Sequence, residues 1–200
     1  MATKRARTRL TYLALFLASA LVVVLSIQNQ RLKERSQSWS LQAKTLTRGS
    51  YVLPVTLLTL SGDSIVLGEG TRQVLAFLST SCPFCTASIP AWDWLEDRLS
   101  GRADTELVLV SLDSLEATAE FLEESKLGAP VALLLEPRIR SAYRANTVPQ
   151  TVVVESNGRV TFSWPETFTT RAADSLLASL PEPSGANREN QDSRQSGGLE

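Results

Sequence analysis

The residues of this chain best suited to chemistry are its only two cysteines, Cys82 and Cys85, which enclose a proline and a phenylalanine. Two thiols at this spacing can form and break a disulfide, which is the basis of thiol–disulfide exchange. A zinc site is not expected, because a structural zinc needs four Cys or His ligands and the chain has no histidine and no third cysteine. A purely structural bridge would gain little, because loop closure stabilises weakly when the loop is so short. The pair therefore predicts a redox-active disulfide that uses no metal and no organic cofactor.

The neighbouring segments place this pair at the start of a helix. The apolar run 73–79 predicts a strand that ends just before Cys82, and Pro83 suits the first turn of the helix that follows. At a helix N-terminus the unpaired backbone N–H groups and the helix dipole stabilise an anion, so we expect Cys82 to react as a thiolate. Cys85 lies one turn later, where it can resolve a mixed disulfide formed on Cys82.

The N-terminal segment predicts a membrane anchor. Residues 10–30 carry no charge, and 10–27 are mostly leucine, alanine and valine, which is just long enough to span a bilayer. A cleaved signal peptide ending near Ala18-Ser19-Ala20 is the alternative, but the apolar run continues through residues 21–25. Basic residues precede the segment, so its start is expected in the cytoplasm: Lys4, Arg5, Arg7 and Arg9. We therefore expect an uncleaved, single-pass protein of the cytoplasmic (inner) membrane whose catalytic domain faces the periplasm or the cell exterior.

Composition divides the chain into five regions. We expect a basic cytoplasmic flank over 1–9, the transmembrane anchor over 10–30, a polar juxtamembrane stalk over 31–50, one folded domain over 51–180 and a disordered tail over 181–200. The tail consists mainly of Pro, Ser, Gly, Asn, Gln and charged residues, which cannot build a core. Nucleic acid is not an expected partner, because the net charge is −1 and the basic residues concentrate at the N-terminus.

Hydrophobic periodicity within 51–180 alternates between strands and helices. Strands are predicted over 51–60, 64–67, 73–79, 106–112, 131–135, 151–155 and 160–164, and helices over 83–99, from Ser114 to Gly128, over 137–145 and over 170–180. The turns at 61–63 and at Asn157-Gly158 predict two β-hairpins. Two of the helices have an apolar face: Ala91, Trp92, Leu95 and Leu99 on the first, which Pro90 should kink, and Leu115, Ala119 and Leu122 on the second. This order predicts an α/β fold, a mixed central sheet flanked by helices, with the cysteines at the C-terminal end of a strand.

Two segments of the chain carry a family resemblance. One is 77–85, Phe-Leu-Ser-Thr-Ser-Cys-Pro-Phe-Cys, followed by Pro90, and the other is 142–151, which contains Val148-Pro149. On these motifs the chain resembles the thioredoxin-like fold, and within it the membrane-anchored thiol-disulfide oxidoreductases of the TlpA/ResA type. The resemblance implies that Val148-Pro149 is a cis-proline pair facing the dithiol, that the Val148 backbone binds an extended substrate segment, and that the N-terminal hairpin belongs to the fold. The first motif is also similar to MauD, the thioredoxin-like accessory protein of methylamine dehydrogenase maturation.

The sequence departs from this family at several positions. Ser81 stands where tryptophan is common, Ala76 where thioredoxins have a buried acid, and Ser88 where ResA-like members have a glutamate. The sequence therefore offers no obvious carboxylate to deprotonate Cys85, since Glu96 reads more simply as a solvated helix residue. Trp94 points away from the apolar helix face and would belong to a protein-docking surface if it were exposed.

The function predicted is thiol–disulfide exchange with protein substrates outside the cytoplasm. Cys82 and Cys85 form the redox disulfide, and Val148 and Pro149 bind the substrate strand. A reductant role would require a membrane protein that donates electrons. The alternative is a thioredoxin-like docking or assembly module, a MauD-like maturation factor with little redox turnover. A peroxiredoxin-like peroxidase is disfavoured, because the arginine and threonine upstream of Cys82 are not arranged as in that family.

Overall fold

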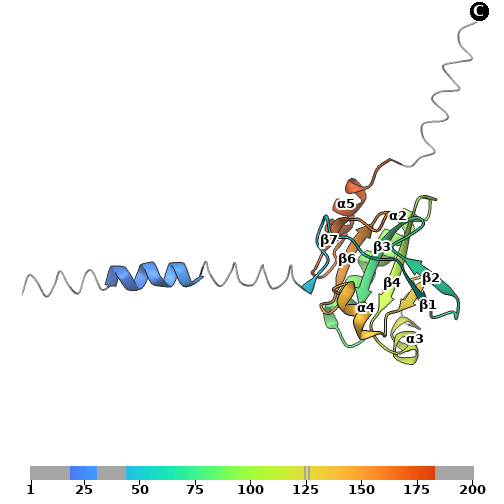
Figure 1. Ribbon diagram of the computed structural model, residues 1–200, viewed down its shortest axis with the longest axis horizontal. Helices are drawn as coiled ribbons and strands as arrows, with labels where there is room; N and C mark the ends of the chain where they lie inside the picture. The colour runs from blue at the N-terminus through green and yellow to red at the C-terminus, as the bar shows by residue number, and fades with distance from the viewer. Residues whose placement is uncertain (1–18, 31–43, 124, 126, 183–200) are drawn as a thin grey trace, which may run out of the picture. The chain divides into compact units, whose positions relative to one another are not determined.

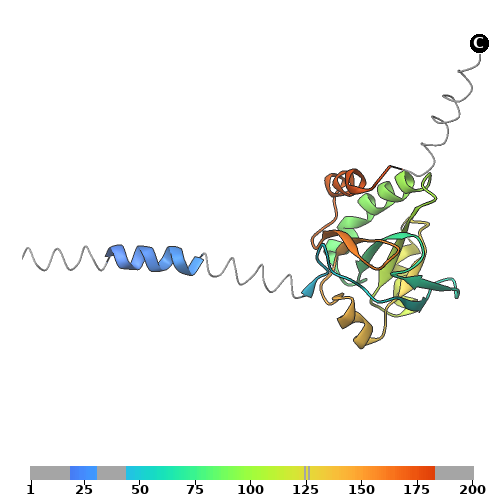
Figure 2. The same ribbon diagram turned by 45° about the horizontal axis from the view of Figure 1, so that its top comes forward.

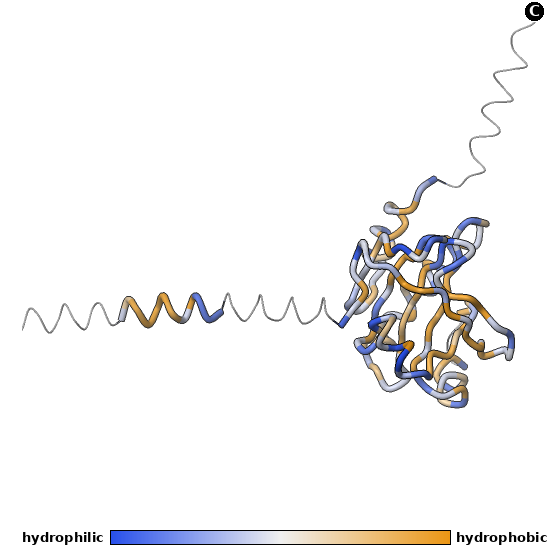
Figure 3. Tube along the Cα trace, viewed as in Figure 1, coloured by the Kyte–Doolittle hydropathy of each residue, from blue (hydrophilic) through white to orange (hydrophobic). Residues whose placement is uncertain are grey.

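In the computed structural model of the protein, residues 19–30, 44–123, 125 and 127–182 are described. Residues 19–30 are helical, and hydropathy colouring shows that most of this helix is apolar (Figure 3). Within the described ranges, no helix combines the length and the apolarity that a bilayer crossing requires. The predicted anchor over 10–30 lies in part outside the described residues, as do the flank over 1–9, most of the stalk and the tail from 183 onward.

A five-stranded mixed sheet forms the centre of the unit that begins at Lys44 (Figure 1). Its strand order is β5-β4-β3-β6-β7, with β3 (Arg72–Leu78), β4 (Thr105–Ser111), β5 (Val131–Leu133), β6 (Gln150–Val154) and β7 (Val160–Trp164). The three strands β3, β4 and β5 are parallel, whereas β6 runs antiparallel to both β3 and β7. The predicted mixed sheet is confirmed, and its strands are predominantly apolar because both faces are covered (Figure 3).

Helices cover both faces of the sheet. The helices α2 (Pro83–Leu99) and α5 (Thr170–Ser179) lie on one face and α4 (Pro137–Ala142) on the other, as Figure 2 shows. The first face buries Trp92, Leu95 and Leu176 against the sheet, and α3 (Leu115–Glu123) packs there through Phe121 and Leu122. The opposite face has its own core, to which Leu46 contributes from the N-terminal side of the domain. Its buried residues include Leu46, Val52, Phe77, Leu134, Tyr143 and Val152.

Both predicted hairpins are present. The strands β1 (Val55–Leu58) and β2 (Ser64–Leu67) pair antiparallel, and Leu60 N–H donates to the carbonyl of Val131, which attaches this hairpin to β5. The turn between β6 and β7 contains Gly158 with φ +79°. A Cβ at Gly158 would lie 2.4 Å from the carbonyl oxygen of Val52, so only glycine fits this close approach.

Several predicted boundaries were wrong. The strand expected over 51–60 is shortened to β1 because Pro54 has no N–H to donate to a ladder. The helix after Ser114 is capped as predicted, since the Ser114 hydroxyl accepts a hydrogen bond from Ala117 N–H at 3.3 Å, but it ends at Glu123 and not at Gly128. The helix expected over 137–145 ends at Ala142.

The predicted apolar face of α3 is only partly buried. Leu115 is exposed, Ala119 and Leu122 are half-buried, and the fully buried residue of this helix is Thr118. The Thr118 hydroxyl lies 2.7 Å from that of Ser111, so a hydrogen-bonded polar pair occupies the contact between α3 and β4. Pairing removes the desolvation cost that would otherwise keep these two hydroxyls at the surface.

Candidate active site: a dithiol beside a cis-proline loop

Cys82 is the N-cap residue of α2, as the sequence predicted. Its backbone is extended (φ −94°, ψ 110°), Pro83 follows in the first turn, and its sulfur accepts a hydrogen bond from Cys85 N–H at 3.3 Å. A sulfur in this position takes the place of a capping oxygen and faces the positive end of the helix dipole. The local geometry therefore stabilises negative charge on the Cys82 sulfur.

The two thiols have unequal environments. Cys82 is partly exposed, whereas Cys85 is fully buried among the core residues of the α2 face. The pKa of the Cys85 thiol is raised to about 12, mainly by burial and next by a hydrogen bond with the Cys82 sulfur. Cys82 is thus the thiol that is accessible from solvent, whereas Cys85 is buried.

The loop before β6 brings a second predicted pair to the dithiol. The Val148–Pro149 peptide bond is cis, as expected from the resemblance. The Cys82 thiol lies 3.8 Å from the carbonyl oxygen of Val148, to which it donates. This contact joins residues 66 positions apart because β6 pairs with β3, with Gln150 opposite Phe77, and so ends beside the strand that leads to Cys82. The half-buried Val148 and the buried Pro149 therefore form one wall of the site.

One carboxylate at this site was missed by the sequence reasoning. The Asp113 Oδ2 accepts hydrogen bonds from Thr80 N–H at 2.6 Å and from the Ser79 hydroxyl at 2.9 Å. Burial tends to raise the pKa of this carboxyl, but these hydrogen bonds and the charge of Arg140 outweigh it, so the pKa lies below its usual range. The signal was its position: Asp113 follows β4 directly, and the ends of adjacent parallel strands share one edge of the sheet.

The positions where the family has acids or tryptophan are used differently here. Ala76 is fully buried in the core. The Ser88 hydroxyl is also buried, and it donates to the carbonyl of Phe84 at 2.8 Å and accepts from Phe168 N–H at 2.9 Å. Ser81 is exposed, with its hydroxyl 3.2 Å from that of Ser79. Ser88 therefore links α2 to the segment before α5, and its neutral hydroxyl places no charge near the dithiol.

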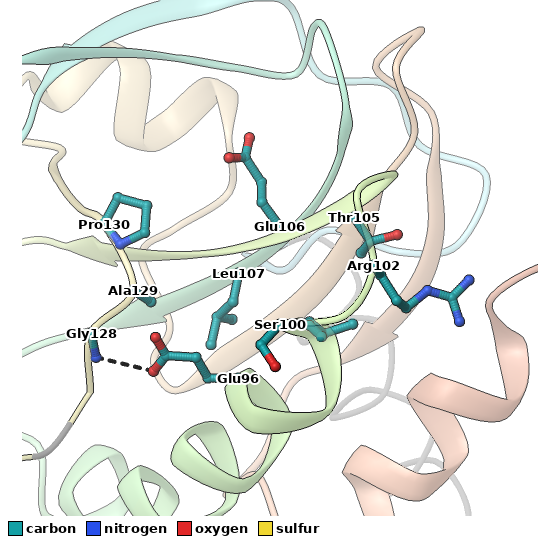
Figure 4. Close-up of a pocket in the computed structure, with 10 residues that line it drawn as sticks. Glu96, Ser100, Arg102, Thr105, Glu106, Leu107, Gly128, Ala129 and Pro130 are labelled. Atoms are coloured by element: carbon teal, nitrogen blue, oxygen red, sulfur yellow. Dashed lines mark hydrogen bonds between the residues drawn. The ribbon is translucent and has the colours of Figure 1, made fainter. Parts of the chain in front are cut away.

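Glu96 is remote from the cysteines. It lies 14 residues after Cys82 on the same helix, about 21 Å along its axis. Its carboxylate accepts a hydrogen bond from Gly128 N–H at 3.1 Å and lines a pocket of about 290 Å³ at the other end of the sheet (Figure 4). Burial raises the pKa of Glu96 above its usual range. Glu96 is therefore neither a base for Cys85 nor a freely solvated residue.

The two tryptophans of α2 also have defined roles. Trp92 is fully buried, and its indole N–H donates to the Thr151 hydroxyl at 3.0 Å. Trp94 is half-buried, and the guanidinium carbon of Arg98 lies 4.7 Å from the centre of its ring. The core role of Trp92 is confirmed, while the stacked Arg98 covers part of the surface that Trp94 would offer to a partner.

A groove opens beside the dithiol loop, between α2 and α3. Its volume is about 400 Å³, and it is lined by Thr80, Thr86, Ile89, Pro90, Glu120, Phe121 and Ser125. Thr80 and Thr86 flank the two cysteines in sequence, so the groove adjoins the site. In the part of the chain that the structure describes, no cluster of three or more Cys, Asp or Glu residues is arranged to hold a metal ion.

Comparison with known proteins places this geometry in a family context. The model of the AhpC/TSA family matches residues 51–163, which include both cysteines and the cis-proline pair. Among curated proteins, none matches the sequence.

Solved structures with the same fold span most of the globular domain. A thiol:disulfide interchange protein from Bacteroides sp. superposes with a TM-score of 0.59 at 18% identity, covering 74% of this chain and 97% of that one. StoA from Bacillus subtilis gives 0.55 at 20% identity, with coverage of 64% and 96%. A peroxiredoxin-like protein from Aquifex aeolicus gives 0.53 at 15% identity, with coverage of 68% and 89%. These superpositions show the shared fold alone, which is the predicted thioredoxin-like α/β architecture.

Proposed function

The chain belongs to the AhpC/TSA family of thioredoxin-like proteins, and from this premise we propose that it is a thiol-disulfide oxidoreductase of the TlpA/ResA type that acts on protein disulfides. One observation carries the proposal: the Cys82 sulfur is at the N-cap of α2, accepts Cys85 N–H and meets the carbonyl of Val148 beside a cis-proline. A reactive thiol, a resolving thiol and backbone groups for a substrate strand thus converge at one edge of the sheet.

The first step of the reaction uses the exposed thiol. The Cys82 thiolate attacks one sulfur of a partner disulfide, forming a Cys82–partner mixed disulfide and releasing the other partner sulfur as a thiolate that takes up a proton. The helix N-terminus stabilises the attacking anion. The carbonyl and N–H groups around Val148 are free of regular strand pairing, so an extended partner segment can add to this loop in the manner of a β-strand.

The second step uses the buried thiol. Cys85 loses its proton and attacks the Cys82 sulfur, forming the Cys82–Cys85 disulfide and releasing the second partner sulfur. Two electrons and two protons pass to the partner in this direction, and the reverse reaction oxidises a partner dithiol. The reduction potential of the Cys82–Cys85 pair sets the direction, and a reductant role would require a membrane electron donor.

We also propose that the domain works outside the cytoplasm, held to the inner membrane by residues 10–30. Support comes from the uncharged sequence of this segment and from the exposed apolar side chains of the described part of its helix: Leu21, Val22, Val23, Val24, Leu25 and Ile27. A helix that is apolar all round is typical of a membrane span. Fusion of a reporter that is active only outside the cytoplasm to the C-terminus tests this topology, and an inactive but stable fusion would contradict it.

The test of the activity is disulfide reduction by the full chain in detergent, followed as turbidity of reduced insulin with a thiol as electron source. The wild type is expected to be active and Cys82→Ser inactive. The Cys85→Ser variant is expected to accumulate a mixed disulfide, because Cys85 no longer releases the partner. An intact wild type that binds partners but reduces none, with binding unchanged in Cys82→Ser, would favour the docking module instead. Consumption of hydrogen peroxide faster than insulin would favour a peroxidase.

A further inference from the structure

The carboxylate of Asp113 is placed to act on the dithiol. We propose that Asp113 is a positioning residue of this site, which holds the turn leading to Cys82 and, through its charge, slows the attack of Cys85 on the mixed disulfide. This inference rests on the proposed exchange activity and adds a residue that controls the rate of its second step.

The hydrogen bonds of Asp113 fix the turn between β3 and α2. Its Oδ2 accepts from Thr80 N–H at 2.6 Å and from the Ser79 hydroxyl at 2.9 Å. The same turn is closed by a hydrogen bond from Cys82 N–H to the carbonyl of Ser79 at 3.1 Å. Every residue from the end of β3 to the reactive cysteine is therefore tied, directly or through one neighbour, to this carboxylate.

The turn also connects Asp113 to Cys85. The Ser79 hydroxyl donates to Asp113, and the backbone of the same residue lowers the pKa of Cys85, against the effect of burial. The negative charge of Asp113 is one of the causes that raise the pKa of Cys85, after burial and the neighbouring Cys82. A carboxylate beside a buried thiol disfavours the thiolate, because the two negative charges repel each other.

Hydrogen bonds from the turn keep Asp113 ionised, and a fixed cation adds to their effect. Arg140 of α4 donates to the carbonyl oxygens of Leu134, at 2.7 Å, and of Leu112, which holds its guanidinium at the ends of β4 and β5. Its charge and the hydrogen bonds from the turn lower the pKa of Asp113, despite its partial burial. The charged groups near this pair of thiols in the described part of the chain include Asp113 and, behind it, Arg140, and Glu120 of α3 lines the adjoining groove.

The consequence concerns the second step of exchange. Loss of the Asp113 charge lowers the pKa of Cys85, and one pKa unit gives a tenfold larger thiolate fraction. A less basic thiolate is also a weaker nucleophile, so the net gain in rate is about threefold at a fixed pH below the pKa. A residue that only supported the turn would not accelerate this step when its charge alone is removed.

The experiment follows the reduced protein with Ellman's reagent. Attack by Cys82 releases one thionitrobenzoate anion and leaves a mixed disulfide, and attack by Cys85 then releases a second anion and forms the Cys82–Cys85 disulfide. The rate of the second phase is measured against pH for the wild type, for Asp113→Asn and for Asp113→Ala. Asparagine retains an acceptor oxygen for the turn but no charge, while alanine removes both. Asp97→Asn removes one charge from an exposed position near the other end of α2 and is the matched control.

We expect the second phase to accelerate in both Asp113 variants, by about threefold for each unit by which the pKa of Cys85 falls. The profile should remain unchanged in Asp97→Asn, and only Asp113→Ala should lower the midpoint of thermal unfolding. An unchanged rate in Asp113→Asn would overturn the inference, and so would a slower rate, which would make the carboxylate a proton acceptor. Acceleration confined to Asp113→Ala would show that a loosened turn is the cause. A wild type that releases no second anion would refute the exchange activity itself, which separates the two failures.

Discussion

The burial of Cys85 should make its thiol slow to react, which can be measured in variants that keep only one cysteine. In Cys82→Ser the only remaining thiol is Cys85, which is fully buried, and burial is the largest cause of its raised pKa. The ordinary pKa is 9.0 and that of Cys85 is about 12. A rise of about three units lowers the thiolate fraction roughly a thousandfold near neutral pH, since each unit is a factor of ten.

Part of this protection disappears with the Cys82 side chain. Burial is a larger cause than the hydrogen bond or the charge of Cys82, so the largest cause of the rise survives in Cys82→Ser. We therefore expect iodoacetamide to modify native Cys85 at least about 100 times more slowly than the same residue in concentrated urea, at about pH 8. In the Cys85→Ser variant, Cys82 is partly exposed and should react at a rate much closer to that of its own unfolded state.

The assay is mass spectrometry of the alkylated protein at timed intervals, with each variant compared with itself in urea. That comparison removes differences in reagent and intrinsic thiol chemistry. Circular dichroism must show that Cys82→Ser remains folded. If native, folded Cys85 is alkylated within about tenfold of its rate in urea, burial does not control this thiol. The two-step order of the mechanism would then lose its physical basis.

Three further predictions concern stability, measured by urea denaturation. Gly158→Ala should destabilise the protein by about 1–2 kcal/mol more than Gly62→Ala. Both glycines have positive φ, but only at Gly158 would the new Cβ meet a carbonyl oxygen, so equal losses of stability would contradict this reasoning. Ser88→Ala should cost about 1–3 kcal/mol, because it leaves the N–H of Phe168 without an acceptor, whereas Ser141→Ala on exposed α4 should cost much less; similar values would remove this role from Ser88. Arg72→Met should cost about 1 kcal/mol at neutral pH, after allowance for solvent screening, since Arg72 bridges Asp104 and Glu155, each at 3.0 Å. Burial acts to raise the pKa of Asp104, but hydrogen bonds from Arg102 and Arg72 outweigh it and the pKa lies below its usual range. The contribution of this ion pair is therefore present above about pH 4 and is lost as the pH falls through the lowered pKa, so a difference between wild type and Arg72→Met that persists in strong acid would count against the ion pair.

The sequence alone determined the elements and the two reactive groups. Helix α2 begins and ends where Pro83 and the apolar spacing predicted, because cap chemistry and periodicity are local properties of the chain. The pairing of Cys82 with Cys85 needs only one helical turn. The cis bond at Val148–Pro149 was expected from a motif and is present, while the role of this pair in substrate binding stays a prediction. The anchor over 10–30 stays a prediction of the sequence.

The tertiary structure decided which groups surround the sulfurs. Asp113 reaches the turn at Ser79 and Thr80 only because β4 lies parallel to β3 in a register that ends both strands at the same edge. Glu96 is on the same helix as the cysteines yet serves the opposite end of the sheet. Helix spacing placed Leu115 on an apolar face, but the residue that is buried there is Thr118, paired with Ser111.

The physical reason is the range of the interactions. Periodicity, capping and turn chemistry depend on neighbours within a few residues, so the sequence displays them directly. Burial and the charges near a thiol depend on segments tens of residues away, which meet only when strand order and register are fixed. For this protein, the sequence therefore names the two thiols, and tertiary packing buries Cys85 and raises its pKa.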